Sequence, residues 1–148
     1  MTNINKTYKG IFKPQNPSKY NGDASNIIYR STWELKVMKY FDIHPDVIWW
    51  ASEELSIKYL NPIDEKVHRY FPDFIVKMKT KDNKVVTYVL EVKPYHQTQQ
   101  PVKKRKTQKF INESVTYVIN QSKWRAADKF CQDQGWQFKV ITEKELGL

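Results

Sequence analysis

The chain has 148 residues, of which 40% are hydrophobic and 14% aromatic, so it can close one core without cross-links and is not a disordered tail. Its single cysteine, Cys131, excludes an internal disulfide and a thiolate zinc cluster. Lys and Arg number 25 against 16 Asp and Glu, a net charge of +9, which favours an anionic partner such as nucleic acid without identifying one.

Membrane and export signals are missing from the sequence. No apolar run is long enough to span a bilayer, and the polar start MTNINKTYKG lacks the apolar segment of a signal peptide. We therefore expect a soluble, intracellular protein with no membrane contact.

The first 25 residues carry turn-forming residues and no hydrophobic periodicity. Gly10, Pro14, Pro17 and Gly22 are spread through this segment together with several Asn. The pattern predicts an irregular N-terminal arm over residues 1–25, which would order only on a partner, followed by a single domain over residues 26–148.

A helix is predicted to begin near Ser31. Trp33, Val37, Tyr40 and Phe41 stand at i, i+4, i+7 and i+8, which is one face of an amphipathic helix. The His44-Pro45 pair ends the pattern. Short extended segments are then predicted at residues 47–51 and 55–60.

The strongest strand signals lie at residues 69–78 and 85–93, which are rich in β-branched and aromatic residues and flank the polar tract TKDNK. They predict a hairpin. Two helices are expected next, over the basic stretch 101–110 and over 123–134, the second ending at Gly135. A strand at 136–141 and a helical turn with a capping box, Thr142 and Glu145, complete the chain.

The predicted hairpin fixes a register. If its loop is residues 80–84, Lys79 pairs with Val85 and Asp73 falls opposite Glu91. Two carboxylates facing each other in an apolar sheet are destabilising unless something compensates, and a divalent cation is the simplest candidate. Lys93 follows Glu91 by two residues and therefore projects from the same face.

Oxygen ligands without a His or Cys cluster suit Mg²⁺ or Mn²⁺. A cation there would polarise a scissile phosphate, while Lys93 would position the attacking water or stabilise negative charge. The alternative from the residues alone is a different register, in which Asp73 and Glu91 lie at exposed strand ends and Lys93 forms a surface ion pair.

Two short segments, residues 71–74 (FPDF) and residues 90–94 (LEVKP), resemble the two halves of the PD-(D/E)XK nuclease signature. The fuller pattern RYFPDFIV, a hairpin, then YVLEVKP resembles the TnsA-type transposase endonucleases and, more closely, the head-completion nucleases of T-even-like tailed phages. Residues 117–146 also resemble the phage family, so the likeness extends from residue 25 onward.

This resemblance implies an α/β fold, the restriction-endonuclease-like core, with a mixed sheet of about four strands flanked by helices. It implies Mg²⁺-dependent or Mn²⁺-dependent hydrolysis of DNA by catalytic Asp73, Glu91 and Lys93. The metal ligands would be Asp73, Glu91 and the backbone carbonyl of Val92. Glu34 matches a further acidic residue that such enzymes carry on a helix, which implies a catalytic role and a possible fourth metal ligand, although Ser31-x-x-Glu34 is also a capping box without chemistry.

Other polar residues near the signature are candidates for DNA contacts or for an ordinary solvated surface. Trp49 and Trp50 fit a core role better than stacking on bases. The candidate DNA-binding residues are Lys103, Lys104, Arg105, Lys106, Lys109, His96 and Gln97.

The phage resemblance further implies action on packaged DNA before the head joins the tail, in the host cytoplasm and the virion. Portal or neck proteins would then be partners besides DNA, with the N-terminal arm as the docking element. Two alternatives are an endonuclease of TnsA or restriction type guided by a specificity partner, and a non-catalytic DNA-binding or structural head protein.

Overall fold

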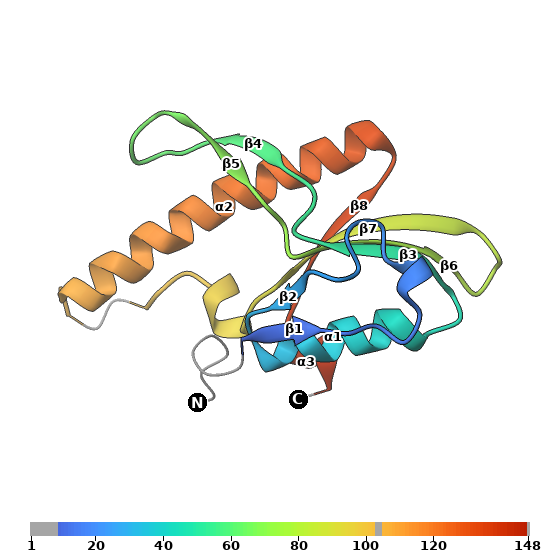
Figure 1. Ribbon diagram of the computed structural model, residues 1–148. Helices are drawn as coiled ribbons and strands as arrows, with labels where there is room; N and C mark the ends of the chain where they lie inside the picture. The colour runs from blue at the N-terminus through green and yellow to red at the C-terminus, as the bar shows by residue number, and fades with distance from the viewer. Residues whose placement is uncertain (1–8, 103–104, 148) are drawn as a thin grey trace.

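The computed structural model describes residues 9–102 and 105–147. Its centre is a mixed four-stranded sheet in the order β3-β6-β7-β8, in which β7 and β8 are parallel and the other pairs are antiparallel. Helices α1 and α3 lie on one side of this sheet and the long α2 on the other (Figure 1). The predicted α/β fold is confirmed. The bounds are β3 Val47–Ser52, β6 Phe74–Lys79, β7 Val85–Val92, β8 Gln137–Ile141, α1 Thr32–Ile43, α2 Gln108–Gln134 and α3 Glu143–Leu146.

A second, two-stranded sheet packs against α2. It consists of β4 (Ile57–Leu60) and β5 (Val67–Tyr70) and contributes to a small core with Ala127 of α2. The prediction of one strand over residues 69–78 is therefore wrong, because β5 ends at Tyr70 and β6 begins at Phe74. Pro72 has no N–H for a sheet ladder, and the chain crosses from one sheet to the other there.

Helix α1 begins where the sequence predicts. The Ser31 hydroxyl caps it by accepting from the Glu34 backbone N–H at 3.1 Å, and His44 ends it. Val37 and Phe41 of the predicted face are buried, but Met38 and Asp42 are buried as well, whereas Trp33 is half-buried and Tyr40 is 47% exposed.

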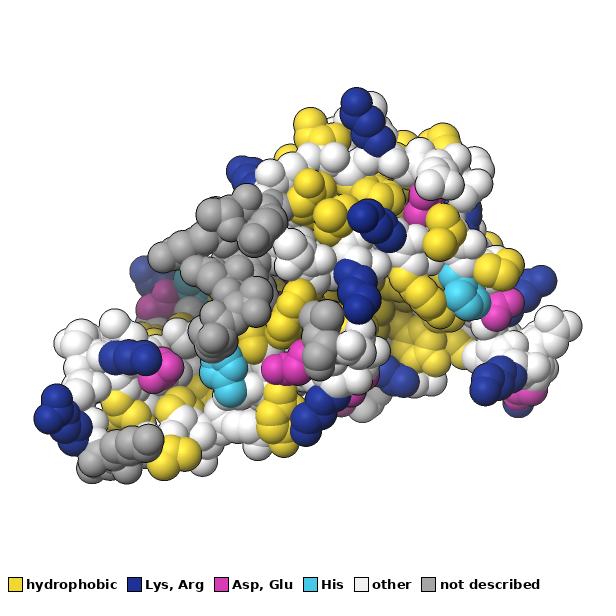
Figure 2. Space-filling model, turned by 90° about the horizontal axis from the view of Figure 1, so that it is seen from below, with side chains coloured by type: hydrophobic (Ala, Val, Ile, Leu, Met, Phe, Trp, Pro, Cys, Tyr) yellow, Lys and Arg dark blue, Asp and Glu magenta, His cyan; other side chains and the backbone are white. Residues whose placement is uncertain are grey.

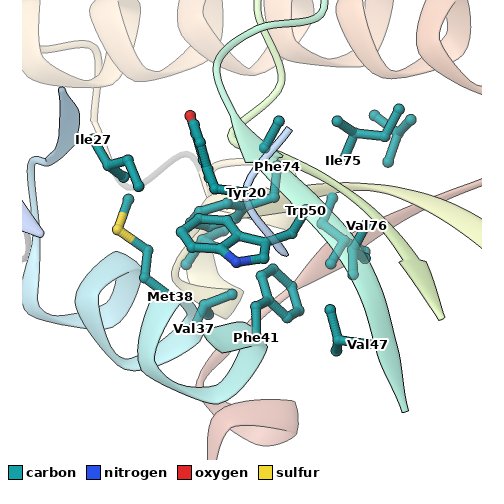
Figure 3. Close-up of a cluster of buried hydrophobic side chains, with 14 of the residues drawn as sticks. Tyr20, Ile27, Val37, Met38, Phe41, Val47, Trp50, Phe74, Ile75 and Val76 are labelled. Atoms are coloured by element: carbon teal, nitrogen blue, oxygen red, sulfur yellow. The ribbon is translucent and has the colours of Figure 1, made fainter. Parts of the chain in front are cut away.

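The main core is organised around Trp50 of β3 (Figure 3). Its indole is fully buried and packs edge-on against Phe12 and Tyr20, while Phe41 of α1 and Phe74 of β6 contact it at tilted angles. Trp50 therefore has the core role that the sequence favours.

The N-terminal segment belongs to this core. Strand β1 (Gly10–Phe12) pairs with β2 (Ile27–Tyr29), and the short 3₁₀ helix η1 (Pro17–Lys19) leads to the buried Tyr20. The buried Asp42 carboxylate accepts from the backbone N–H groups of residues 15 and 16 at 2.8 and 2.9 Å. Residues 9–25 therefore contact the core while they contain little regular structure besides β1 and η1, and residues 1–8 of the predicted arm lie outside the described part.

One long helix replaces the two that the sequence predicts after the hairpin. Helix α2 is capped by Thr107 and ends at Gly135, which takes the left-handed φ of 77°. The prediction for residues 123–134 is confirmed, but the described residues before Gln108 are not α-helical. No described helix is long and apolar enough to cross a membrane. The final strand and the Thr142–Glu145 capping box are both confirmed.

Candidate active site

The register of β6 and β7 brings the predicted acidic pair together. Lys79 pairs with Val85 and Phe74 with Leu90, which confirms the predicted register and puts Asp73, immediately before β6, across from Glu91. Asp73 Oδ2 accepts a hydrogen bond of 2.7 Å from the Val92 backbone N–H. The alternative with both acids at exposed strand ends is therefore wrong.

The Glu91 carboxylate is buried and held at both oxygens. Its Oε1 accepts a 2.6 Å hydrogen bond from the hydroxyl of the buried Tyr70, and its Oε2 lies 3.6 Å from Lys93 Nζ. The predicted convergence of Asp73, Glu91 and Lys93 is thus present in the structure.

Burial dominates the electrostatics of this acidic pair. It raises the pKa of Asp73 well above its usual value, the neighbouring Glu91 charge raises it further, and the Val92 N–H opposes both effects. Burial also raises the pKa of Glu91, against the attraction of Lys93, Tyr70 and Lys123. A positively charged ligand between the acids would relieve this cost.

Two further residues of the site, Tyr70 and Lys123, escaped prediction. Lys123 of α2 places its ammonium 5.7 Å from the Tyr70 ring centre and 5.8 Å from that of Tyr59. Burial lowers the pKa of Lys123, and the Glu91 charge opposes that shift. In one continuous strand Tyr70 and Asp73 would face opposite sides, so only the break at Pro72 lets both approach Glu91. Nothing in the sequence marks Lys123.

Glu34 sits at the start of α1 in a capping arrangement. Its carboxylate accepts from the Arg30 backbone N–H at 3.4 Å and from the Ser31 hydroxyl at 3.2 Å. Burial raises the pKa of Glu34, and its charge in turn raises the pKa of Asp73. Glu34 therefore borders the acidic pair while bonding back to its own helix terminus.

The donor set fits a cation that keeps much of its water. Asp73 and Glu91 each use one oxygen in a hydrogen bond, to Val92 and Tyr70, and retain Asp73 Oδ1 and Glu91 Oε2. Mg²⁺ is commonly held by one or two carboxylates plus water and phosphate oxygens. No group of three or more His, Cys, Asp or Glu side chains in residues 9–102 and 105–147 is placed to hold a metal ion, so a cage made of protein ligands alone does not fit.

The predicted DNA-binding residues lie on the surface of the protein. Those that the structure describes are all exposed, whereas Lys103 and Lys104 lie outside the described residues. On the face shown in Figure 2, Lys and Arg side chains are scattered among hydrophobic and neutral surface and form no continuous stripe. Their DNA-binding role stays a prediction. The exposed residues are Arg105, Lys106, Lys109, His96 and Gln97.

A mixed sheet that presents an acidic pair and a lysine from adjacent strands defines a nuclease-like site, and comparison with known proteins agrees. The model of the TnsA-like endonuclease N-terminal family matches residues 44–143, and the chain belongs to this family. The match includes Asp73, Glu91 and Lys93 but not Glu34.

A curated relative covers nearly the whole chain. The protein is similar to the head completion nuclease of Enterobacteria phage T4, with 36% identity over 144 residues, which are 94% of this chain and 93% of the relative. The resemblance to TnsA-type and phage head-completion nucleases is thereby confirmed, and the chain is a nuclease by class.

Proposed function

We propose that this protein is a metal-dependent deoxyribonuclease that hydrolyses phosphodiester bonds at Asp73, Glu91 and Lys93. The observation that carries the proposal is the opposition of the Asp73 and Glu91 carboxylates, whose pKa values are both raised by burial, beside a lysine 3.6 Å from Glu91. Membership in an endonuclease family supports the same conclusion.

The chain's own groups divide the chemistry. Asp73 and Glu91 would hold the metal, which when bound polarises the scissile phosphate and lowers the pKa of a water molecule. The Val92 N–H and the Tyr70 hydroxyl fix the orientation of these carboxylates. Lys93 Nζ would stabilise the developing charge on the phosphate or orient the attacking water.

Metal removal tests this function directly. We expect nicking of supercoiled DNA and degradation of linear DNA with Mg²⁺ or Mn²⁺. We expect no cleavage with EDTA, because the negatively charged carboxylates cannot polarise a phosphate without a metal ion. Gel assays with increasing metal concentration measure the effect, and restoration by Mg²⁺ after EDTA is the control. Cutting that persists in EDTA would contradict the proposal.

Tyr70→Phe is expected to weaken metal binding and cleavage by about 10–100-fold, the usual range for losing a hydrogen bond that orients a metal ligand. Without the hydroxyl, Glu91 loses a bond to its charged form and its pKa rises further. The pH profile of cleavage should therefore shift to higher pH. Mn²⁺ titration by calorimetry and rate measurements across pH check this, with Tyr59→Phe as control. An unchanged profile would show that Tyr70 does not orient Glu91.

We infer that the biological setting is head completion, because the T4 relative bears that name and matches this chain almost end to end. Its substrate would then be packaged DNA or its end, and portal or neck proteins would be partners. Nuclease activity that acts on DNA in filled, tailless heads, together with cosedimentation of the protein with those heads, would support the inference. Strand-specific cutting that needs a specificity partner would favour the TnsA-like alternative.

A further inference from the structure

A groove of about 590 Å³ runs beside the proposed active site, within the size range of ligand-binding clefts. One wall is the 3₁₀ helix η2 (Tyr95–Thr98) with the residues that follow it, and the other is the N-terminal half of α2. The groove has no role in the chemistry described above.

Both walls continue into the active site. Tyr95 follows Lys93 by two residues at the end of β7, and Asn120 precedes Lys123 by three residues, nearly one turn of α2. Lys123 lies over Tyr70, which bonds Glu91. A DNA strand leaving the acidic pair therefore has this groove as its adjacent surface.

The lining chemistry suits bases rather than phosphates. The chain carries 25 Lys and Arg, yet none is among the described residues that line the groove. Apart from the tyrosines, the titratable side chains of the described lining are Glu113 and His96. Flat aromatic rings stack on nucleobases and carboxamides bond their edges. The groove offers both kinds of group, in Tyr95, Tyr117, Gln97, Gln99, Asn112 and Asn120.

Asn120 and Tyr95 are both fixed in position by their surroundings. Asn120 lines the groove although it is only 6% exposed, so its carboxamide is a nearly buried polar group beside any ligand there. Tyr95 is held from behind, since its N–H donates to Glu143 at 2.6 Å and Lys144 Nζ lies 3.5 Å from its ring centre.

We propose that this groove binds unpaired nucleobases of a DNA strand that runs past the active site, so that the nuclease prefers DNA with single-stranded ends or flaps over fully paired duplex. This proposal rests on the proposed function. A peptide segment is the competing occupant, but the tyrosine and carboxamide lining and the continuity of the groove with the acidic pair favour a nucleic acid strand.

Binding of two DNA substrates tests the proposal without cleavage, in EDTA. One is a duplex with a single-stranded overhang containing 2-aminopurine, and the other is the same duplex with blunt ends. We expect Tyr117→Leu to lose about tenfold in affinity for the overhang substrate, the effect of one stacked base. The double variant Gln97→Ala/Asn112→Ala should lose affinity for the same substrate because it lacks hydrogen bonds to base edges. Both variants should bind blunt duplex as the native protein does. The 2-aminopurine fluorescence should fall when the overhang substrate binds the native protein, and it should not fall when the substrate binds the variants.

Tyr40→Leu is the matched control, because Tyr40 is an exposed tyrosine of α1 outside the groove. An equal loss of affinity for both substrates, or no loss for either, would overturn the proposal. Because Gln97 and Asn112 are both exposed, their double variant leaves the core untouched. Metal-dependent cutting of blunt duplex by these variants separates the two outcomes: the proposed function then stands even if the groove proposal fails.

Discussion

Replacing Glu91 with Gln, or Asp73 with Asn, is expected to reduce DNA cleavage at saturating Mg²⁺ by at least about 100-fold, since the loss of a residue that only orients a metal ligand already lowers activity by about 10–100-fold. Each substitution keeps the shape of the side chain and removes one negative charge from the pair. The rate of supercoiled DNA nicking measures the effect. Asp82→Asn in the exposed β6–β7 turn is the matched control, and activity that survives Glu91→Gln would place the chemistry elsewhere.

The same substitutions should stabilise the metal-free fold at neutral pH. Burial raises the folded-state pKa of both acids, so their contribution to the free energy of unfolding is largest at low pH and is lost as pH rises through those pKa values. Asp73→Asn and Glu91→Gln remove that loss. Urea unfolding in EDTA from about pH 4 to about pH 8 checks the difference. Variants that are less stable than the native protein at pH 8 would contradict the described electrostatics.

Tyr20→Ala is expected to lower the free energy of unfolding by about 3–5 kcal/mol, the range for removing a large buried aromatic side chain. Tyr20 is 7% exposed, lies 4.8 Å from Trp50 between ring centres, and its hydroxyl oxygen accepts from the Ser52 N–H at 3.1 Å. Urea denaturation followed by tryptophan fluorescence measures the change.

Two variants make this result specific. Tyr40→Ala removes the same atoms from a site that is 47% exposed and should cost far less. Tyr20→Phe keeps the packing and deletes the two hydrogen bonds between the Tyr20 hydroxyl and the Ser52 backbone, with an expected cost of about 1–3 kcal/mol. A Tyr20→Ala variant as stable as Tyr40→Ala would mean that the N-terminal segment is a separate arm after all.

Local patterns in the sequence identify the elements that surround the acidic pair. The start of α1 at Ser31, the turn at residues 80–84 and the Thr142 capping box all arise from contacts within a few residues, and the structure confirms each of them. Since a hairpin register follows from its turn, the sequence also predicted that Asp73 would lie opposite Glu91. The resemblance added the nuclease family.

Long-range packing decides what the sequence missed. A three-residue strand such as β1 carries no periodic signal, and its place is set by pairing with β2 and by Phe12 on Trp50. Residues 111–122 show no clear apolar face in the sequence and are not predicted to be helical, yet they continue α2 between its Thr107 cap and Gly135.

The sequence by itself determined that an acidic pair and a lysine share one hairpin, because turn chemistry and the alternation of a strand are local properties. Only the tertiary structure decided which groups surround that pair. The break at Pro72 sends β5 to a second sheet, and that sheet's packing on α2 brings Tyr70 and Lys123 to Glu91. Residues that meet through the packing of two elements have no fixed spacing along the chain, so no local pattern reveals them.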